Sequence, residues 1–400
     1  MLKQVQHDDT TLSIFILFMN SIIGYFSTKF GELWDKDLSD LMFDALDGVL
    51  KKIKLEKSAI DAIFFGNMLG GVVEEKLLLE AHIAEVLGVN IPIYRVEAAC
   101  ASGGLAFQMA HEYLKNNSNK TVVVLGAEKM TDISAENITK SLACAASSDE
   151  QAVGLTFPGV YAMIAKLYLQ KFHYKEEHLA AISVKNHAHA VLNENAHFRR
   201  YVTVDDVLES PYVAYPLKVL DSSPISDGAA ALVLTNRKLV IGNQKSSQIL
   251  SSEVATDCIS IAKRERLDEL KATKIAGEKA FKISGLKRSD ISVMEVHDCF
   301  SIAEILALED LGFWKKGEGG KHAKSMSTAA ESGGNLIVNT SGGLKAAGHP
   351  VGGTGIKQIG EIHLQLTEQA GERQVRKAKY GLAHNVGGSG GLAVVSILGV

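Results

Sequence analysis

Cysteine is scarce in this chain, with four among 400 residues, at positions 100, 144, 258 and 299. Thiols so widely scattered do not form a paired zinc motif, and they are too few for a disulfide framework in a chain of this length. We therefore expect a reducing, cytoplasmic setting and no metal site.

An excess of one charge is absent as well. Lys and Arg total 42, Asp and Glu total 46, and the formal net charge is -4. This balance implies no basic surface, which argues against nucleic acid as a partner. The acidic residues are spread along the chain rather than grouped, so there is no acidic tail either.

A long hydrophobic run is also missing. Residues 12–18 are apolar, but Asp8 and Asp9 precede them where a secretory signal needs positive charge, and polar residues follow too soon for a bilayer-spanning helix. We therefore expect no membrane attachment. Residues 1–18 are expected to be an extension outside the fold, with Met19 as the natural start.

Apolar residues are plentiful, at 46% against 22% charged. They suffice for an ample core in two or three domains or in one large duplicated domain. Strands and helices alternate along the first part of the chain, which is typical of a parallel α/β fold. The expected strands cover residues 22–26, 60–65, 91–96 and 122–126, and the expected helices cover residues 38–50, 72–87 and 105–114.

This pattern then repeats. Residues 57–65 are echoed by residues 288–296, each a helix-to-strand connection of the same length. The turn at Cys100 and the turn at Gly348 and His349 each open an apolar helix that leads to a strand and a glycine turn. Self-similarity on this scale indicates duplication. Two halves stacked back to back would bring both turns to one central site.

Cys100 stands where a nucleophilic thiol belongs, at the end of an apolar strand and the start of a turn of small residues. If a helix begins near Gly103, its unpaired N–H groups and positive dipole end favour the thiolate. A cysteine that merely fills space is the alternative. The glycine-rich residues 342–355 place His349 at the mouth of an apolar helix, where an imidazole can accept a proton from a thiol.

Two further strand ends supply partners for this pair. One carries His297 and a second thiol, Cys299, which can act as acid or base. The other, residues 384–391, forms a glycine turn whose free amides can face a developing oxyanion.

Together and in this order, the segments resemble the thiolase family. Thiolases carry a Cys-x-Ser-Gly-Gly-type turn, a Gly-His-Pro motif and a late glycine-rich loop, which correspond here to residues 100–104, 348–350 and 387–391. The resemblance runs from about residue 20 to residue 400.

Two departures point to one branch of that family. Common thiolases have Asn-Glu-Ala-Phe where this chain has His-Asp-Cys-Phe at residues 297–300, and a cysteine where it has Asn385. Both departures occur together in the branch that resembles sterol carrier protein x and the archaeal acetoacetyl-CoA thiolases. Residues 193–199 and 221–231 also resemble that branch.

The resemblance implies an α/β fold in which thiolase-like duplicated βαβαβαββ halves form a five-layered α-β-α-β-α core. The expected N-terminal thiolase domain covers residues 19–130 and 221–243. A loop domain that covers coenzyme A is expected at residues 131–220, and the C-terminal thiolase domain at residues 244–400.

It also implies an acetyl-CoA C-acyltransferase that forms or cleaves acetoacetyl-CoA or another 3-ketoacyl-CoA. Cys100 attacks the thioester and His349 takes its proton. Cys299 is the candidate base for the second acetyl-CoA. The enolate then needs an electrophilic pocket, which His297 and His349 supply.

The remaining implied roles concern binding. The amides of Cys100 and Gly387 hold the oxyanion, and Asn385 orients that loop. Arg199, with Arg200 beside it, is a candidate for the coenzyme A phosphates. Acyl-CoA and coenzyme A are the small-molecule partners, with no metal or redox cofactor, and thiolases are usually dimers or pairs of dimers.

Other interpretations stay open. A decarboxylating or hydroxymethylglutaryl-type condensing enzyme shares the fold. A catalytically weak acyl-CoA-binding or scaffold subunit is the second, held in a complex with hydroxymethylglutaryl-CoA synthase by a small zinc-ribbon acyl-CoA-binding protein. The glycine runs at residues 348–355 and 387–391 lack the spacing, the preceding strand and the downstream acidic residue of a dinucleotide-binding fingerprint.

Three histidines allow a further interpretation. His187, His189 and His197 are interpreted as solvated surface rather than as metal ligands.

Overall fold

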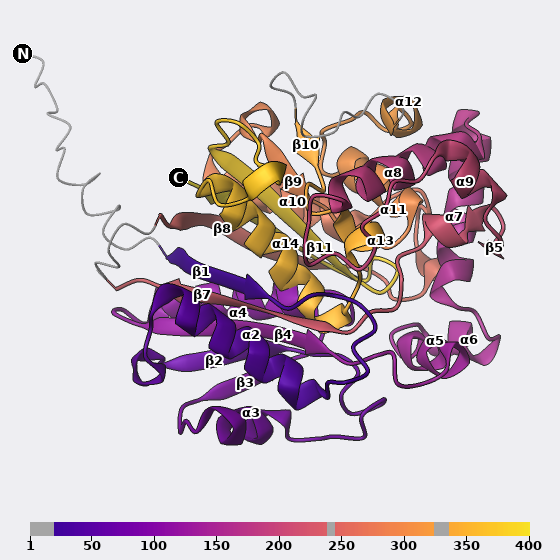
Figure 1. The fold of residues 1–400 in the computed structure, drawn as a ribbon. Coiled ribbons are helices and arrows are strands. Elements are labelled where there is room, and N and C mark those ends of the chain that lie inside the picture. The colour runs from indigo at the N-terminus through magenta and orange to yellow at the C-terminus, as the bar shows by residue number, and fades with distance from the viewer. Residues whose placement is uncertain (1–19, 238–244, 324–335) are drawn as a thin grey trace, which may run out of the picture.

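A mixed sheet of ten strands organises the chain (Figure 1). The computed structural model describes residues 20–237, 245–323 and 336–400. The predicted extension at residues 1–18 and the predicted domain boundary at residues 243 and 244 lie outside the described residues.

The strands form two sets with the same topology. In the N-terminal half the order is β3-β2-β4-β7-β1, and in the C-terminal half it is β10-β9-β11-β12-β8. When only the strands of this sheet are numbered along the chain within each half, both orders are third, second, fourth, fifth and first, because β5 and β6 form a separate small sheet. Because the two strand orders are the same, they confirm the predicted duplication. The strands are β1 (Ser21–Ser27), β2 (Ala62–Gly66), β3 (Ile93–Val96), β4 (Thr121–Glu128), β7 (Gly228–Thr235), β8 (Ser247–Thr256), β9 (Val293–Glu295), β10 (Ile337–Val338), β11 (Tyr380–Gly387) and β12 (Leu392–Gly399).

Strands β1 and β8 join the two sets, where Ser21 pairs with Gln248 and Ile22 pairs with Ser247. The echoed connections are also real. A short 3₁₀ helix, η1 (Lys57–Ala59), precedes β2, and its counterpart, η4 (Arg288–Asp290), precedes β9.

Two long helices lie between the two sets of strands. Helix α4 (Ser102–Asn116) follows β3 and α14 (Val351–Leu366) follows β10, so they are equivalent members of the duplication. They contact each other and strands of both halves. The core around them joins side chains such as Phe64 of β2, Ile249 of β8 and Ile356 of α14.

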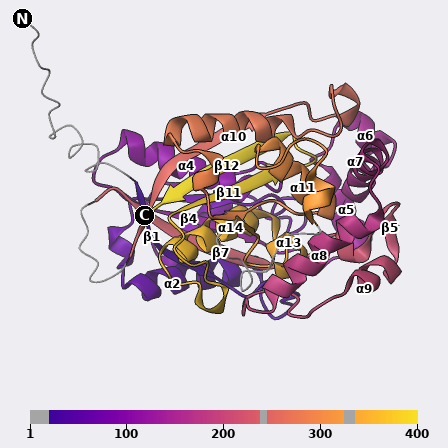
Figure 2. The ribbon, with the colours of Figure 1, turned by 90° about the horizontal axis from the view of Figure 1, so that it is seen from above.

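Helices α2 (Leu38–Ile53) and α10 (Lys271–Ser284) cover the outer faces of the two sets, α2 against β1, β4 and β7 and α10 against β8 and β12 (Figure 2). The result is the predicted α-β-α-β-α layering. Helix α2 begins at a capping box formed by Asp37 and Asp40 and ends at the left-handed Lys54. Its buried stripe recurs every three or four residues, at Leu38, Leu41, Met42, Ala45, Leu46, Val49, Leu50 and Ile53.

The second predicted helix, at residues 72–87, is wrong at its start. The structure has α3 only from Leu79 to Leu87, because Leu78 adopts a left-handed backbone with φ of 54° and Glu75 one with φ of 52°. Residues in that region do not propagate a right-handed helix. Leu77 and Leu78 are largely exposed, so the apolar spacing there does not mark a buried face.

The first turn of α14 packs directly against the backbone of β2 and β4. A Cβ on Gly352 would lie 2.4 Å from the carbonyl oxygen of Gly66 and 2.8 Å from that of Ala127. Glu128, at the end of β4, accepts a hydrogen bond from the N–H of Gly352 at 2.9 Å. The start of α14, directly after His349, is therefore held at a fixed distance from the ends of β2 and β4.

The region between β4 and β7 breaks the strand-helix alternation and lies to one side of both sets of strands (Figures 1 and 2). Its α7 and α8 pack with α11 (Ser301–Asp310) of the C-terminal half. This region contains α5 (Ala135–Ala143), α6 (Ser148–Ala152), α7 (Phe157–Phe172), α8 (Glu176–Ala190), α9 (Val204–Glu209), β5 (Tyr212–Ala214) and β6 (Leu217–Lys218). The remaining elements are α12 (Gly319–Ala323), α13 (Gly343–Ala347), η2 (Val219–Asp221), η3 (Ile261–Lys263) and η5 (Gly371–Arg373).

The histidines of α8 are buried, which corrects the expectation of a solvated surface. His187 and His189 are 1% and 2% exposed, and Nδ1 of His189 lies 2.9 Å from the carbonyl oxygen of Asn339. Burial lowers the pKa of each to about 4, so both are neutral at pH 7. The reason is that α8 packs against α11, α12 and α13, which a polar sequence pattern alone does not reveal. Across the described chain, no helix is both long enough and apolar enough to cross a bilayer.

Candidate active site

The duplication brings four catalytic candidates together. Cys100 lies in the turn from β3 to α4, and His349 lies in the equivalent turn from β10 to α14. His297 and Cys299 lie between β9 and α11. Cys100, Cys299 and His349 line one cavity of about 590 Å³. The sulfur of Cys100 and one ring nitrogen each of His297 and His349 all lie within 4.8 Å of one another.

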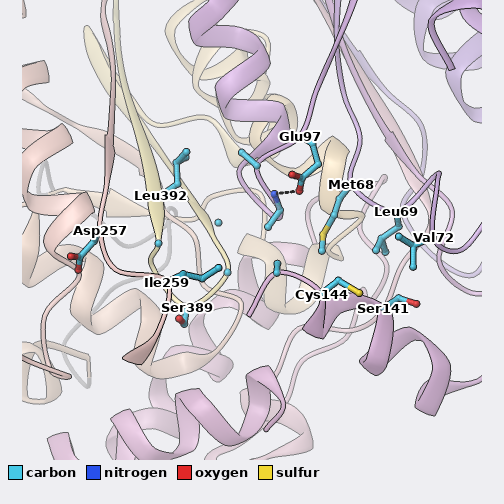
Figure 3. A pocket seen from close by; sticks show the side chains of 16 residues that line it. Met68, Leu69, Val72, Glu97, Ser141, Cys144, Asp257, Ile259, Ser389 and Leu392 are labelled. Carbon is cyan, nitrogen blue, oxygen red and sulfur yellow. Dashed lines mark hydrogen bonds between the residues drawn. The ribbon is translucent and has the colours of Figure 1, made fainter. Parts of the chain in front are cut away.

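Side-chain hydrogen bonds hold the strained turn before Cys100. Ala99 has a left-handed φ of 50°, which is uncommon for a residue with a side chain. Its N–H donates to Oε1 of Glu97 at 2.6 Å, as the dashed line in Figure 3 shows. The hydroxyl of Ser102 donates to the carbonyl oxygen of Ala99 at 2.6 Å and accepts from the N–H of Ala98 at 2.9 Å.

Burial decides the protonation state of Cys100. It raises the pKa of the thiol to about 12, although hydrogen bonds from the N–H groups of Gly388 and of Cys100 itself act in the opposite direction. Desolvation therefore favours the neutral thiol over the thiolate that the position at a helix N-terminus predicts. Attack by Cys100 requires a base that removes its proton.

His349 is a neutral imidazole with a free nitrogen, as a base for the Cys100 proton must be. Its Nδ1 lies 2.7 Å from Oγ1 of Thr354, and that hydroxyl donates its own proton to the carbonyl oxygen of Pro350 at 2.8 Å. Thr354 must therefore accept from Nδ1–H, which leaves Nε2 of His349 unprotonated. Burial lowers the pKa of His349 to about 3, so the imidazole is neutral at physiological pH.

His297 lies beside His349. The two imidazole rings lie 5.2 Å apart at 81° to each other. Burial holds the pKa of His297 well below its usual range, so this ring is neutral as well. Asn385 on β11 contacts His297, Cys100 and Gly104, which places the predicted loop residue inside the site.

The second thiol has neighbours that the sequence interpretation missed. Burial raises the pKa of Cys299 well above its usual range, while a hydrogen bond with Tyr161 and the charge of Lys345 lower it. Tyr161 comes from α7 and stacks on Phe300 at 4.7 Å. Its one hydroxyl proton can be donated either to Cys299 or to the carbonyl oxygen of Gly388, which lies 3.3 Å away. Nothing in the sequence around Tyr161 marks it as part of the site.

Lys345 could have been considered a site residue from the sequence, because it lies inside the glycine-rich segment that carries His349. It is 1% exposed, lines the same cavity, and donates from Nζ to the carbonyl oxygen of Asp221 at 2.6 Å. A fully buried ammonium beside a thiol is a group that stabilises the thiolate.

At two of the predicted positions, the structure also places the neighbouring residue in the site. The amide of Gly388, rather than that of Gly387, forms a hydrogen bond with the Cys100 thiol. Gly387 ends β11 and pairs with Leu392. Arg200 lines the cavity, whereas the guanidinium of Arg199 donates to the carbonyl oxygen of Val191.

A second cavity of about 420 Å³ is shown in Figure 3. Ala98, Ala99 and Glu97 of the segment before Cys100 line it. Gly388 is among the lining residues of both cavities.

A thiol, a neutral imidazole aimed to accept its proton and a duplicated α/β scaffold define a class of enzymes that carry acyl groups on cysteine. Comparison with known proteins identifies the family. The description "Thiolase, N-terminal domain" matches residues 20–238, and "Thiolase C-terminal domain-like" matches residues 254–400. The chain belongs to the thiolase family and is an acyltransferase.

Its relatives include the two kinds predicted. An acetyl-CoA acetyltransferase of Methanothermobacter thermautotrophicus is 42% identical over 380 residues, which cover 94% of this chain and 98% of that protein. Sterol carrier protein 2 of Bos taurus is 32% identical over 393 residues, which cover 94% of this chain and 71% of that protein.

Solved structures share the fold. The Ltp2-ChsH2(DUF35) aldolase superposes with a TM-score of 0.81 at 21% identity and covers 96% of this chain and 98% of that one. The Acat5 thiolase from Ascaris suum in complex with coenzyme A superposes with a TM-score of 0.70 at 17% identity and covers 95% of this chain and 99% of that one.

Proposed function

We propose that this chain is an acetyl-CoA C-acetyltransferase that forms or cleaves acetoacetyl-CoA or another 3-ketoacyl-CoA. The observation that carries the proposal is the meeting of Cys100, Cys299 and His349 on one cavity. Relatives at 41 to 42% identity that are named acetyl-CoA acetyltransferase support it. They also favour the catalyst over a scaffold subunit.

In the first half-reaction, Nε2 of His349 takes the Cys100 proton as sulfur attacks the thioester carbon. The N–H groups of Cys100 and Gly388 stabilise the oxyanion. Coenzyme A leaves as a thiolate and takes the proton of Cys299, so the acyl group stays on Cys100. A Cys299 thiolate and an imidazolium at His349 remain.

In the second half-reaction, the Cys299 thiolate removes a proton from the carbon next to the carbonyl of acetyl-CoA. His297 and the His349 imidazolium stabilise the enolate oxygen. The carbanion attacks the acyl carbon, Cys100 leaves as a thiolate, and it recovers its proton from His349. Both thiols return to the neutral state that burial favours, with no net oxidation.

Acetylation of the intact protein tests this proposal. On incubation with acetyl-CoA, we expect one added acetyl group, mapped to Cys100 by peptide mass spectrometry, and then its transfer to a second acetyl-CoA. Cys100→Ser should lose both steps. Cys299→Ser should still acquire the acetyl group, more slowly because coenzyme A must leave without that proton, but should form no acetoacetyl-CoA. Turnover that survives in Cys100→Ser would exclude the acyl-cysteine route.

We also infer a homodimer or homotetramer, as the family resemblance implies, which light scattering on the purified chain checks. Association with hydroxymethylglutaryl-CoA synthase through a zinc-ribbon acyl-CoA-binding protein is a finer proposal. Mixing the three purified proteins and measuring the mass of the product checks it. The Ltp2-ChsH2(DUF35) aldolase gives a structural precedent for a thiolase-fold chain in a complex.

The proposed coenzyme A ligand is Arg200, which lines the cavity, with Arg199 beside it. A guanidinium suits a phosphate group. Arg200→Ala should raise KM for acetyl-CoA while kcat changes little, and a larger effect from Arg199→Ala would reassign the ligand.

A further inference from the structure

Asn385 connects three parts of the active site. Its Oδ1 accepts a hydrogen bond from the backbone N–H of Gly104 at 3.1 Å. Its Nδ2 donates to the carbonyl oxygen of Cys100 at 3.0 Å and lies 3.2 Å from Nδ1 of His297. The residue is only 3% exposed, so these protein groups define its surroundings.

These contacts fix the direction of the amide. A flipped side chain would point its N–H groups at the N–H of Gly104 and its oxygen at the carbonyl of Cys100, and both contacts would repel. Nδ2 therefore faces His297. An NH₂ group only donates, so Nδ1 of His297 accepts and the proton of this neutral ring lies on Nε2.

The two histidines consequently have opposite tautomers. His349 carries its proton on Nδ1, toward Thr354, and offers a lone pair at Nε2. His297 carries its proton on Nε2, which is buried and has no hydrogen-bond partner within the described residues. An unmatched buried donor is unfavourable, and a substrate oxygen that accepts its hydrogen bond would remove that cost.

The same side chains would otherwise suit a metal ion. Cys100, His297 and His349 form the one cluster of three metal-type ligands among the described residues. A thiolate and two imidazoles match the donors that Zn²⁺ prefers. A metal-binding histidine usually donates its other N–H to a carboxylate or a carbonyl. Asn385 instead presents a donor to that nitrogen.

We propose that Asn385 is a positioning residue that keeps the His297 proton on Nε2, so that the cluster offers an N–H donor to a substrate oxygen instead of three ligands to a divalent metal. The substrate part rests on the proposed function. The tautomer and the resistance to metal do not, and they can be measured without turnover.

Asn385→Asp reverses the direction of the hydrogen bond. A carboxylate still accepts from Gly104, but its other oxygen now accepts a hydrogen bond from Nδ1–H of His297, which frees Nε2. In ¹⁵N spectra of histidine-labelled protein, we expect wild-type His297 to have a protonated Nε2 and a bare Nδ1, and the variant to have the reverse. Co²⁺ titration at pH 8 should give a thiolate-to-metal absorption band in the variant, with affinity on the order of 10- to 100-fold above wild type.

The chain offers a matched control. Nδ2 of Asn20 lies 3.0 Å from Nδ1 of His111 and donates to the His111 carbonyl oxygen at 2.9 Å, with both residues buried. Neither residue belongs to the cavity around Cys100. Asn20→Asp should therefore change only the His111 signals and add no Co²⁺ band. Adding Cys100→Ser to Asn385→Asp should remove the band.

The wild-type spectrum decides the matter even if Asn385→Asp folds poorly. A wild-type His297 protonated on Nδ1, or wild-type Co²⁺ binding as tight as that of the variant, would overturn the proposal. If the tautomer is as expected but no acetyl group reaches Cys100, the proposed function fails while the role of Asn385 stands.

Discussion

Desolvation dominates the chemistry of single residues in this site. Cys100, Cys299, His297 and His349 all have pKa values moved toward the neutral form by burial. These two thiols and two imidazoles therefore carry no charge at rest, and each proton must move while the substrate is bound.

The pH dependence of alkylation tests this state at Cys100. Since burial raises its pKa to about 12, the iodoacetamide rate at Cys100 should be low at pH 7 and still rise above pH 10, without a plateau near 8.5. The exposed Cys144 and Cys258 are internal controls that should react first. Peptide mass spectrometry over a pH series measures all three. Faster reaction at Cys100 than at Cys144 at pH 7 would contradict a resting thiol.

Lys345→Met tests the partner of Cys299. Without the ammonium, the pKa of Cys299 should rise further, so acetoacetyl-CoA formation should fall about tenfold, which corresponds to one pKa unit. Acetylation of Cys100 should change less. Lys185→Met is the control, because Lys185 is also buried and donates to a backbone carbonyl, that of Val338 at 2.9 Å, but does not line the cavity. Equal losses in both half-reactions would contradict the assignment.

Sequence patterns were enough to predict that four candidate side chains lie close together. Cys100, His297, Cys299 and His349 each follow a strand and open a turn, and such turns meet at the same sheet edge in a duplicated fold. Tyr161 could not be predicted, because its place depends on how α7 packs against α11. The resting thiol at Cys100 could not be predicted either, because burial depends on the whole fold.

At the scale of elements, the start of α14 depends on glycine. Gly352→Ala should cost roughly 1–3 kcal/mol or more of unfolding free energy, because its Cβ would lie 2.4 Å from a backbone oxygen that cannot move aside. Displacement of α14 should also lower acetylation of Cys100, because His349 directly precedes it. Urea unfolding and single-turnover acetylation measure the two effects.

Gly353→Ala is the matched control for that change. The nearest atom to its added Cβ is the carbonyl oxygen of Gly126 at 3.4 Å, an ordinary contact. Alanine is the better helix former, so this variant should gain about 0.5–1 kcal/mol. Similar stabilities for the two variants would show that α14 is free to shift.

The duplication was predictable because both halves repeat the same alternation, and the layering was predictable from the resemblance to thiolases. The boundaries of α3 were not, since the left-handed turn at Leu78 leaves no clear mark in the apolar pattern. The burial of α8 was missed for a related reason. Its polar residues contact other buried polar groups, such as Asn186 with Asp298 at 2.7 Å, rather than water.

At the scale of the whole molecule, one core spans both halves. Helices α4 and α14 share a hydrophobic cluster with strands of each half. We therefore expect the two helices to exchange their amide hydrogens through the same global unfolding. Hydrogen exchange of peptides from residues 102–116 and 351–366 should give equal opening free energies. Much weaker protection of one helix would mean that the halves unfold independently.

The contact between α4 and α14 has a consequence for how this protein can diverge. A Cβ on Gly103 would lie 2.5 Å from the carbonyl oxygen of Gly352, so the two helices meet backbone to backbone. Main-chain dimensions thus set the separation of the two helix starts that follow Cys100 and His349. Substitutions at Phe157 or Tyr161 of α7, which line the cavity, can therefore change its shape while that separation stays constant.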